Sequence, residues 1–154
     1  MVRIRHLFIS PGHNYFGHHG RSPSTHATVE VDELDCIAGR GIRGDRFLDF
    51  KDNYKGQITF FALEVFNQVN STLGLTGISP GVTRRNVITE GMDLNDLIGS
   101  EFDIQGIRFQ GIEECRPCYW MNTSFGHKDV ETLLRGNGGL RARILSNGTL
   151  RMEQ

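Results

Sequence analysis

Hydrophobic residues recur along this chain in short runs, many of which alternate with polar residues. Alternation with a period of two is typical of strands that bury one face, and an apolar run of about four to eight residues is consistent with a strand buried on both faces. The pattern predicts strands over residues 2–9, 27–37, 57–61, 87–89, 101–105, 107–112, 140–145 and 149–152.

Two short polar segments predict how some of these strands are joined. Gln105-Gly106 lies between two predicted strands, and so does Ser146-Asn147-Gly148, in which Asn-Gly favours the positive φ of a tight hairpin turn. An antiparallel hairpin is therefore expected at each segment.

Helical spacing of apolar residues is confined to short segments. It predicts a helix over residues 62–73, with Gly74 at the position of a helix-ending glycine. A single helical turn capped by Asp93 is expected over residues 93–98, and a short helix within residues 127–135.

Many short strands, two or three short helices and no regular alternation of strand and helix favour a mainly β fold of the α+β class. We expect an antiparallel, barrel-like β domain in which at least six strands form a closed or nearly closed barrel, with helices outside it or across its ends. The chain has 154 residues, enough for a hydrophobic core of its own, so a single domain over residues 1–154 is expected.

Composition and charge limit the partners of this domain. The net charge is −1 and 38% of the residues are hydrophobic, so there is no overall basic field for nucleic acid. The chain has no signal-peptide pattern and no run near the roughly 20 apolar residues of a membrane span, which predicts a cytoplasmic protein outside the membrane. Its three cysteines, an odd number, favour reduced thiols over a disulfide framework.

The basic residues are unusual in kind, because there are fourteen Arg and only three Lys. The planar guanidinium group binds phosphate and carboxylate through paired hydrogen bonds, so the excess indicates anion recognition, with a solvated surface as the alternative. We expect several of the clustered arginines to converge in one cleft near Cys118. They are Arg40, Arg43, Arg46, Arg84, Arg85, Arg116, Arg141 and Arg143.

Two of these clusters lie in segments with restricted geometry. Residues 39–44 satisfy the G-x-G-x-x-G pattern, but no helix is predicted at these glycines, and a dinucleotide site requires one. The preferred interpretation is a glycine-permitted loop whose amide and guanidinium groups hold an anion, with a tight turn and solvated arginines as the alternative. Arg84 and Arg85 enter a predicted strand, where neighbouring side chains point to opposite faces, so both can serve one pocket only if the backbone is irregular there.

The chemistry of the chain is expected at Cys115 and Cys118, which follow a predicted strand and are three residues apart. A thiolate is a strong nucleophile and a soft-metal ligand, and a neighbouring cation such as Arg116 favours it. Four interpretations compete: a reactive thiol or soft-metal ligand, half of a zinc site that includes Cys36 or distant histidines, a dithiol redox pair, and two inert buried cysteines.

A loop over residues 10–26 has no hydrophobic periodicity and contains four histidines. Loops of this length are usually binding lids or are disordered. The four side chains are candidate metal ligands, with solvated loop histidines as the alternative; they are His13, His18, His19 and His26.

Several short motifs, in this order along nearly the whole chain, resemble the MOSC domain family, named for the C-terminal domain of molybdenum-cofactor sulfurases. The motifs are Gly44-Asp45-Arg46, Arg84-Arg85-Asn86-Val87-Ile88-Thr89 followed by Gly91 and Asp93-Leu94, Gly99, Cys115-x-Pro117-Cys118, and Gly138-Gly139-Leu140-Arg141-Ala142-Arg143.

The resemblance implies a β-rich, barrel-like domain with one key cysteine that carries sulfur or coordinates the molybdenum of a bound molybdopterin. By motif position this residue is Cys118, which is the expected catalytic thiol and metal ligand in preference to Cys115 and Cys36. The expected cofactor-binding residues are Asp45, Arg46, Arg84, Arg85, Asn86, Arg141 and Arg143.

Two classes of function follow from the resemblance. In the first, the domain binds molybdenum cofactor, and Cys118 ligates the metal while an N-hydroxylated or similar small molecule is reduced with a redox partner. In the second, Cys118 carries a persulfide from a separate cysteine desulfurase, because this sequence contains no desulfurase domain. A module that binds an anionic small molecule without turnover is a third alternative. Pyridoxal phosphate is not expected here, since none of the three lysines lies in a pocket motif.

Overall fold

The computed structural model describes residues 2–12 and 28–153, in which ten strands form two sheets. The seven-stranded sheet has the order β2-β1-β6-β5-β9-β8-β7 and the three-stranded sheet the order β10-β3-β4. Their bounds are β1 (Arg3–Ile9), β2 (Val29–Glu30), β3 (Glu33–Ile37), β4 (Gly41–Ile42), β5 (Ile58–Ala62), β6 (Val87–Glu90), β7 (Glu101–Ile104), β8 (Ile107–Glu114), β9 (Leu140–Ile144) and β10 (Gly148–Arg151).

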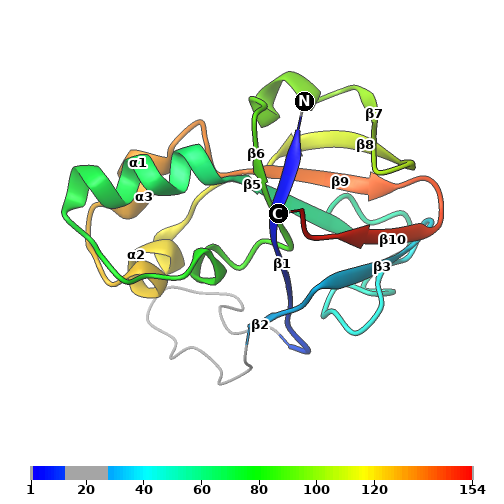
Figure 1. Ribbon diagram of the computed structural model, residues 1–154, viewed down its shortest axis with the longest axis horizontal. Coiled ribbons are helices and arrows are strands. Elements are labelled where there is room, and N and C mark those ends of the chain that lie inside the picture. Colours follow the sequence, from blue (N-terminus) through cyan, green and yellow to red (C-terminus); the bar gives the residue numbers. More distant parts are fainter. Residues whose placement is uncertain (1, 13–27, 154) are drawn as a thin grey trace.

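The predicted fold class is confirmed, since the chain is rich in strands and its ladders are antiparallel with one exception. The exception is the parallel pair of β5 and β6, joined through helix α1 (Leu63–Leu73), which is a β-α-β unit that the sequence pattern did not indicate. The three-stranded sheet lies beside the larger one and gives a barrel-like shape (Figure 1). A closed barrel is not formed, because no ladder among the described residues joins the edge strands β2 and β7.

Three α-helices gather on one side of the sheets (Figure 1). The predicted helix is confirmed as α1, which ends at Gly74 with a left-handed φ of 67°. Helix α3 (Val130–Leu134) lies within the predicted segment, whereas α2 (Tyr119–Phe125) was not predicted. Two 3₁₀ turns complete the set: η1 (Pro80–Thr83), and η2 (Leu94–Leu97), which Asp93 caps as expected through its side chain.

The chain packs around two hydrophobic clusters. The larger lies between the sheets and includes Leu34 of the small sheet and Phe60, Phe109 and Leu140 of the large one, all fully or almost fully buried. The smaller joins the helices to the large sheet through side chains such as Phe66 of α1. Burial of apolar surface in both clusters stabilises the strands and helices. It thereby also holds in place the strand ends and turns that connect these elements.

The two predicted hairpins have different outcomes. The Gln105-Gly106 hairpin is confirmed, with positive φ at both turn residues, and it joins β7 to β8. The second prediction is wrong, because β10 pairs with β3 and not with β9. The side chain of Asn147 accepts a hydrogen bond from the amide of Ala38 at 2.7 Å, so it ties the connection to the small sheet instead of forming a positive-φ turn.

A buried asparagine joins three neighbouring strands of the large sheet. Asn86, just before β6, accepts hydrogen bonds through Oδ1 from the amide and the hydroxyl of Thr59 in β5, and its Nδ2 donates to the carbonyl of Phe8 in β1 at 3.2 Å. Its backbone carbonyl also accepts from the amide of Phe8 at 2.8 Å. Buried polar groups are stabilising only when they are paired in this way, so Asn86 fixes the chain directly after the two adjacent arginines.

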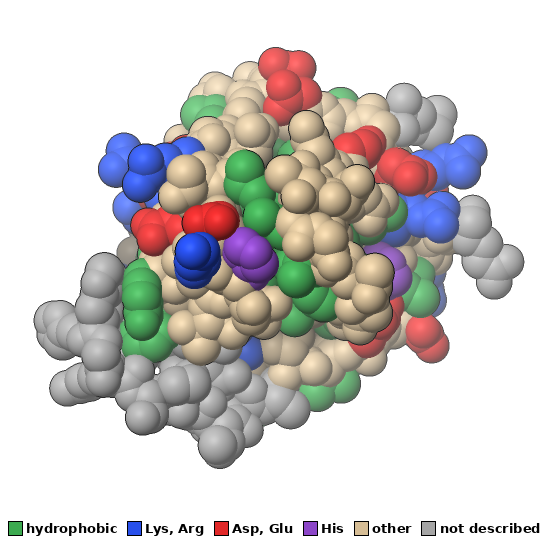
Figure 2. All heavy atoms as spheres, turned by 90° about the vertical axis from the view of Figure 1, so that its left-hand side faces the viewer, with side chains coloured by type: hydrophobic (Ala, Val, Ile, Leu, Met, Phe, Trp, Pro, Cys, Tyr) green, Lys and Arg blue, Asp and Glu red, His purple; other side chains and the backbone are tan. Residues whose placement is uncertain are grey.

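The surface over the helices has mixed charge. Figure 2 looks onto this side of the molecule and shows Lys and Arg side chains beside Asp and Glu side chains. This mixture agrees with the near-zero net charge of the chain. Within the described part of the chain, none of the helices has the length and apolar character needed to cross a membrane.

Candidate functional site

A cavity of about 170 Å³ lies where the turn between β8 and α2 meets β9 and the segment between η1 and β6. Its described lining contains five arginines and two cysteines but no Asp or Glu: Arg46, Arg84, Arg85, Arg116, Arg141, Cys115 and Cys118. The expected convergence of several arginines near Cys118 is therefore confirmed. A smaller cavity of about 90 Å³ shares Arg46, Arg84, Arg85, Arg141 and Cys115, so the two are adjoining parts of one cleft.

The buried carboxylate of Asp45 holds Arg46 in the wall of the cavity. Its Nη1 lies 3.2 Å from Oδ1 of Asp45, whose side chain is fully buried and also accepts the amide of Ser10 at 3.0 Å. Burial lowers the pKa of the Arg46 guanidinium and the charge of Arg85 lowers it further, although Asp45 and Cys115 act in the opposite direction. Asp45 thus positions Arg46 without itself lining the cavity.

Arg84 and Arg85 both reach the cavity because the backbone between η1 and β6 is irregular. Arg84 has a left-handed φ of 55°, a conformation that costs a non-glycine residue about 1 kcal/mol or more. The backbone is thus irregular at the entry to the strand, which is the condition under which two adjacent side chains can line one pocket. The Arg84 guanidinium donates to the hydroxyls of Ser10 and Thr28, at 2.9 and 2.7 Å, which links the cavity wall to β1 and to the residue before β2.

Arg85 is a structural connection between three segments. Its guanidinium donates to the carbonyls of Thr83, Gly138 and Cys115 at 3.0, 3.2 and 3.2 Å. A guanidinium has five N–H groups in one plane, which lets one side chain hold several carbonyls at once. Arg85 therefore fixes the position of Cys115 more than it offers itself to a ligand.

Arg141 is the arginine most closely connected with Cys115. Burial lowers the pKa of its guanidinium, but the charge of Cys115, a side-chain hydrogen bond with Cys115, and the charges of Tyr54 and Glu113 together raise that pKa above its ordinary value. Its Nη1 also lies 3.6 Å from Oε1 of Glu113, the residue opposite it on β8. Arg141 and Cys115 also line the smaller cavity together.

The three cysteines have different surroundings. Cys36 lies in β3 in the core, where burial and the charge of Asp35 raise its pKa to about 12, which agrees with its expected role as an apolar core residue. Cys115 is only 6% exposed, whereas Cys118 is exposed at the start of α2. Cys115 and Cys118 both line the cavity, and all three thiols are free.

Aromatic side chains that the sequence analysis did not single out complete the cleft. The guanidinium carbon of Arg46 lies 4.7 Å from the ring centroid of Phe47, which in turn stacks on Tyr54 at 5.4 Å. Trp120 and Met121 of α2 line the other side. The only sequence signal for this wall was the charged and aromatic segment after Asp45, which has no helical or strand periodicity.

The family of the chain follows from a comparison of its sequence with family models. The model described as "MOSC domain" matches residues 12–154, nearly the whole chain. The chain belongs to the MOSC domain family. No curated protein matches its sequence. The resemblance that the motifs implied is thereby confirmed at the level of the family.

Several solved structures share the fold of this chain. The YuaD protein from Bacillus subtilis has a TM-score of 0.74 and 20% identity, with 99% of this chain and 92% of that chain covered. YiiM from Escherichia coli has a TM-score of 0.63 and 19% identity, covering 92% of this chain and 65% of that chain. YiiM from Geobacillus stearothermophilus has a TM-score of 0.69 and 14% identity, covering 98% and 71%. At these identities the likeness establishes a shared fold.

Some arginines of the MOSC chain lie outside the cleft. Arg40 pairs with Asp49 on the surface, and Arg43 lies 3.6 Å from Asp35. Arg143 shares a strand face with Arg141, as expected, but its Nε donates to the carbonyl of Asn53 and it does not line the cavity. Of the expected cofactor-binding residues, Asp45, Asn86 and Arg143 thus lie behind or beside the cavity, while Arg46, Arg84, Arg85 and Arg141 line it.

The described residues bear on the metal sites that the sequence suggested, a zinc site at the cysteines and ligands among the loop histidines. In residues 2–12 and 28–153, no group of three or more His, Cys, Asp or Glu side chains is placed to hold a metal ion. Cys36 lies in the core cluster between the sheets and does not line the cavity of Cys115 and Cys118. The four histidines His13, His18, His19 and His26 lie outside the described residues.

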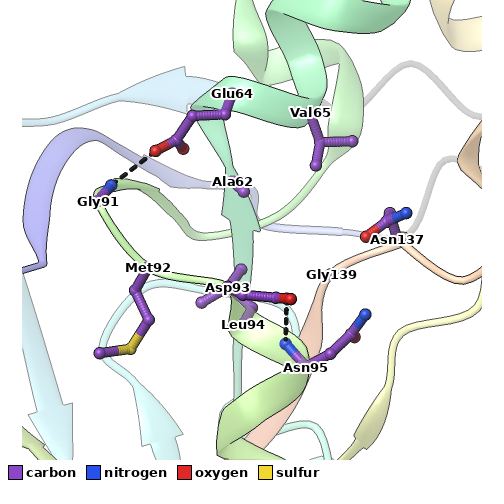
Figure 3. A pocket seen from close by; sticks show the side chains of 10 residues that line it. All are labelled: Ala62, Glu64, Val65, Gly91, Met92, Asp93, Leu94, Asn95, Asn137 and Gly139. Atoms are coloured by element: carbon purple, nitrogen blue, oxygen red, sulfur yellow. Dashed lines mark hydrogen bonds between the residues drawn. The ribbon is translucent and has the colours of Figure 1, made fainter.

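A larger cavity of about 410 Å³ lies on the other side of the segment that precedes β9 (Figure 3). It is lined by the start of α1, the turn before η2, and residues 137 and 139. Its two carboxylates are already used within the protein, since Glu64 accepts the amide of Gly91 at 2.7 Å and Asp93 accepts that of Asn95 at 3.0 Å. The described lining has no thiol and no arginine, so it contains neither kind of group on which the expected chemistry depends.

Proposed function

We propose that this MOSC domain binds a molybdenum cofactor of the molybdopterin type in the arginine-lined cleft and presents the thiol of Cys118 to it. The observation that carries the proposal is the lining itself, in which five guanidinium groups and two thiols surround one cavity whose described lining has no carboxylate. Guanidinium groups recognise phosphate, and thiolates are ligands of soft metals. A ligand that combines a phosphate group with a metal fits both parts of this lining.

The residues of the cleft divide the binding between them. Arg141 offers a side chain that is 31% exposed and keeps donors beyond its contact with Glu113, so it is the proposed main ligand of the phosphate. Arg116, exposed on the turn between the thiols, adds positive charge at the entrance. Arg46 and Arg85 each donate hydrogen bonds within the protein from both terminal nitrogens and would hold the walls in place. When bound, the cofactor would supply the redox chemistry.

The test is to purify the protein from a host that makes molybdenum cofactor, and to measure molybdenum by elemental analysis and pterin by the fluorescence of its oxidised form. We expect near-stoichiometric amounts of both in the wild type. In Arg141→Gln we expect a loss on the order of tenfold, as for a lost charge-assisted hydrogen bond. Arg143→Gln is the matched control, because Arg143 lies two residues away on the same strand face but outside the cavity.

A negative result must be separable from a failure of the host. A protein known to bind molybdenum cofactor is therefore produced in the same cells. If that protein carries molybdenum and pterin while the wild-type MOSC domain carries neither, the cofactor proposal is rejected. Equal loss in Arg141→Gln and Arg143→Gln would instead show that binding does not depend on the cavity.

A second candidate function is a persulfide carrier that receives sulfur from a separate cysteine desulfurase. The observation that favours it is the exposure of Cys118, whose thiol lines the cavity and is also open to solvent at the start of α2. Sulfur transfer between proteins requires an accessible thiol, because one sulfur atom must approach the other directly. Incubation with a pyridoxal-phosphate-dependent desulfurase and free cysteine tests it, with the mass of one added sulfur atom as the readout.

A further inference from the structure

The two cysteines of the cleft differ in their exposure and in their surroundings. A site that uses a single key cysteine does not account for this difference. Cys118 is exposed, whereas Cys115 is 6% exposed and lines the smaller part of the cleft together with Arg46 and Arg141. The same cavity is lined by both, and they are three residues apart in the chain. Cys118 is therefore the more accessible of the two residues, and Cys115 is the buried one, in the part of the cleft that Arg46 and Arg141 also line.

The backbone holds Cys115 in place. Its amide donates to the carbonyl of Gly139 at 2.8 Å, and its own carbonyl accepts from Nη2 of Arg85 at 3.2 Å. Gly138 approaches it so closely that an added Cβ would lie 2.2 Å from the carbonyl oxygen of Cys115. These contacts fix the backbone of Cys115, and with it the place of this residue in the wall of the cleft.

We propose that Cys115 is a second functional thiol, and that sulfur passes from Cys118 to Cys115 within the cleft. The proposal rests on the persulfide-carrier function. Cys118 is the thiol that a protein donor can reach, whereas Cys115 is the thiol beside the cations that would hold an anionic acceptor. A sulfur atom delivered at the entrance must therefore move inward before it can meet a ligand bound by Arg46 and Arg141.

The transfer is an exchange without net oxidation or reduction. The Cys115 thiolate attacks the outer sulfur of the Cys118 persulfide, a new sulfur–sulfur bond forms at Cys115, and the original bond breaks so that Cys118 leaves as a thiolate. The proton of the persulfide stays with the transferred sulfur or is exchanged with solvent. Arg141, which lines the same part of the cleft as Cys115, would stabilise the attacking thiolate.

The test follows the position of the sulfur in three proteins that all carry Cys36→Ala: the parent, Cys115→Ser and Cys118→Ser. Each is incubated with a pyridoxal-phosphate-dependent cysteine desulfurase and cysteine, then alkylated, digested and fragmented in a mass spectrometer to locate the added sulfur. We expect persulfide mainly on Cys115 in the parent and only on Cys118 in Cys115→Ser. In Cys118→Ser, loading of Cys115 should fall by on the order of tenfold or more, because the desulfurase cannot reach it.

Three outcomes would overturn the transfer. They are persulfide that stays on Cys118 in the parent, loading of Cys115 in Cys118→Ser at the parental rate, and a Cys115–Cys118 disulfide formed with release of sulfide. The first of these rejects the transfer alone, because Cys118 still carries sulfur. If neither thiol of the parent acquires sulfur, the persulfide-carrier function itself fails.

Arg141→Gln separates a role in the transfer from a role in the fold. We expect the ratio of persulfide on Cys115 to persulfide on Cys118 to fall by on the order of tenfold in this variant, because the attacking thiolate loses a neighbouring cation. Arg143→Gln should leave both steps unchanged, since Arg143 lies outside the cavity. An equal rate of transfer in Arg141→Gln and Arg143→Gln would contradict the part assigned to Arg141.

Discussion

The carbonyl oxygen of Cys115 lies where Gly138 would carry its β-carbon, at a separation of 2.2 Å. The segment before β9 and the turn that bears both thiols are therefore in direct backbone contact. Two hydrogen-bonding groups join the same segments: the amide of Cys115 donates to the carbonyl of Gly139, and the guanidinium of Arg85 donates to carbonyls of both segments. Together with the close contact, they make one rigid unit at the edge of the cleft. The geometry of the thiols depends on the absence of one methyl group.

Gly138→Ala is expected to destabilise the protein by about 2 kcal/mol or more, because the methyl group overlaps backbone atoms that cannot move independently. Unfolding in urea, followed by circular dichroism, measures the change. The control is Gly136→Ala, at which a Cβ meets no atom within 4 Å and only the left-handed φ of 82° opposes the substitution. That control should cost about 1 kcal/mol. Equal losses would mean that the close approach is not what requires glycine at position 138.

The three thiols should react with iodoacetamide in the order of their exposure. At pH 8 we expect Cys118 to be modified first, Cys115 more slowly, and Cys36 only after unfolding, since Cys36 is 2% exposed and burial raises its pKa to about 12. Mass spectrometry of the modified peptides at successive times gives the order. Modification of Cys115 before Cys118 in the folded protein would contradict the assignment of the exposed and buried thiols.

The thiol of Cys36 should make the folded protein less stable at high pH. Burial and the charge of Asp35 raise its pKa from 9.0 to about 12. Above pH 9 the unfolded chain loses this proton while the folded chain keeps it, so the unfolded state binds fewer protons and the free energy of unfolding falls. The contribution is fully present below pH 9 and decreases by at most about 1.4 kcal/mol per pH unit up to about pH 12.

Cys36→Ala isolates this effect from the other groups that titrate in the same range. Below pH 9 the variant should be less stable than the wild type by a constant amount, because it leaves a small gap in the core. Between pH 9 and 11 the difference should shrink, as only the wild type loses the contribution of the thiol. Stability curves that stay parallel over this range would show that the proton is not held more tightly in the folded state.

Replacement of Arg85 by lysine should be strongly destabilising although the charge is kept. The guanidinium holds the carbonyls of Thr83, Gly138 and Cys115 together, and a single ammonium group cannot reach all three. We expect a loss of about 3 kcal/mol in urea unfolding. Arg40→Lys, at an exposed pair with Asp49, is the control and should change stability very little. Similar stability of both variants would remove the structural role assigned to Arg85.

The elements that local patterns decide were predictable from the sequence. Strand β1, helix α1 and the turn at Gln105-Gly106 follow from periodicity and from residues that tolerate positive φ, and all were found. Strand β10 was also predicted, but the strand with which it was expected to pair was wrong. Strand pairing depends on which surfaces meet in three dimensions. The side chain of Asn147 bonds to Ala38, more than a hundred residues away, and no local signal indicates this.

The candidate site was predictable in kind and not in detail. The excess of arginine and the two thiols indicated an anion site with a reactive sulfur, and Arg46, Arg84, Arg85 and Arg141 do meet beside Cys118. Helix α2 was missed, since Cys118-Tyr119-Trp120 follows a proline and has too few residues to show a helical period. The left-handed backbone of Arg84 is imposed by its neighbours, and position 84 itself carries no glycine that would have indicated it.

The network around Asn86 links the cleft to the folding of the whole sheet. The cavity arginines Arg84 and Arg85 directly precede this residue, and its side chain is satisfied only when β1, β5 and β6 have come together from distant parts of the chain. An unfolded chain therefore has no partial binding site, and a ligand that fills the cleft binds the native state alone. At about 100 times its dissociation constant such a ligand would add about 2.7 kcal/mol to the free energy of unfolding. The midpoint of heat denaturation, measured in the presence of each of a panel of phosphorylated compounds, would then rank the compounds by affinity. This measurement requires no knowledge of the reaction.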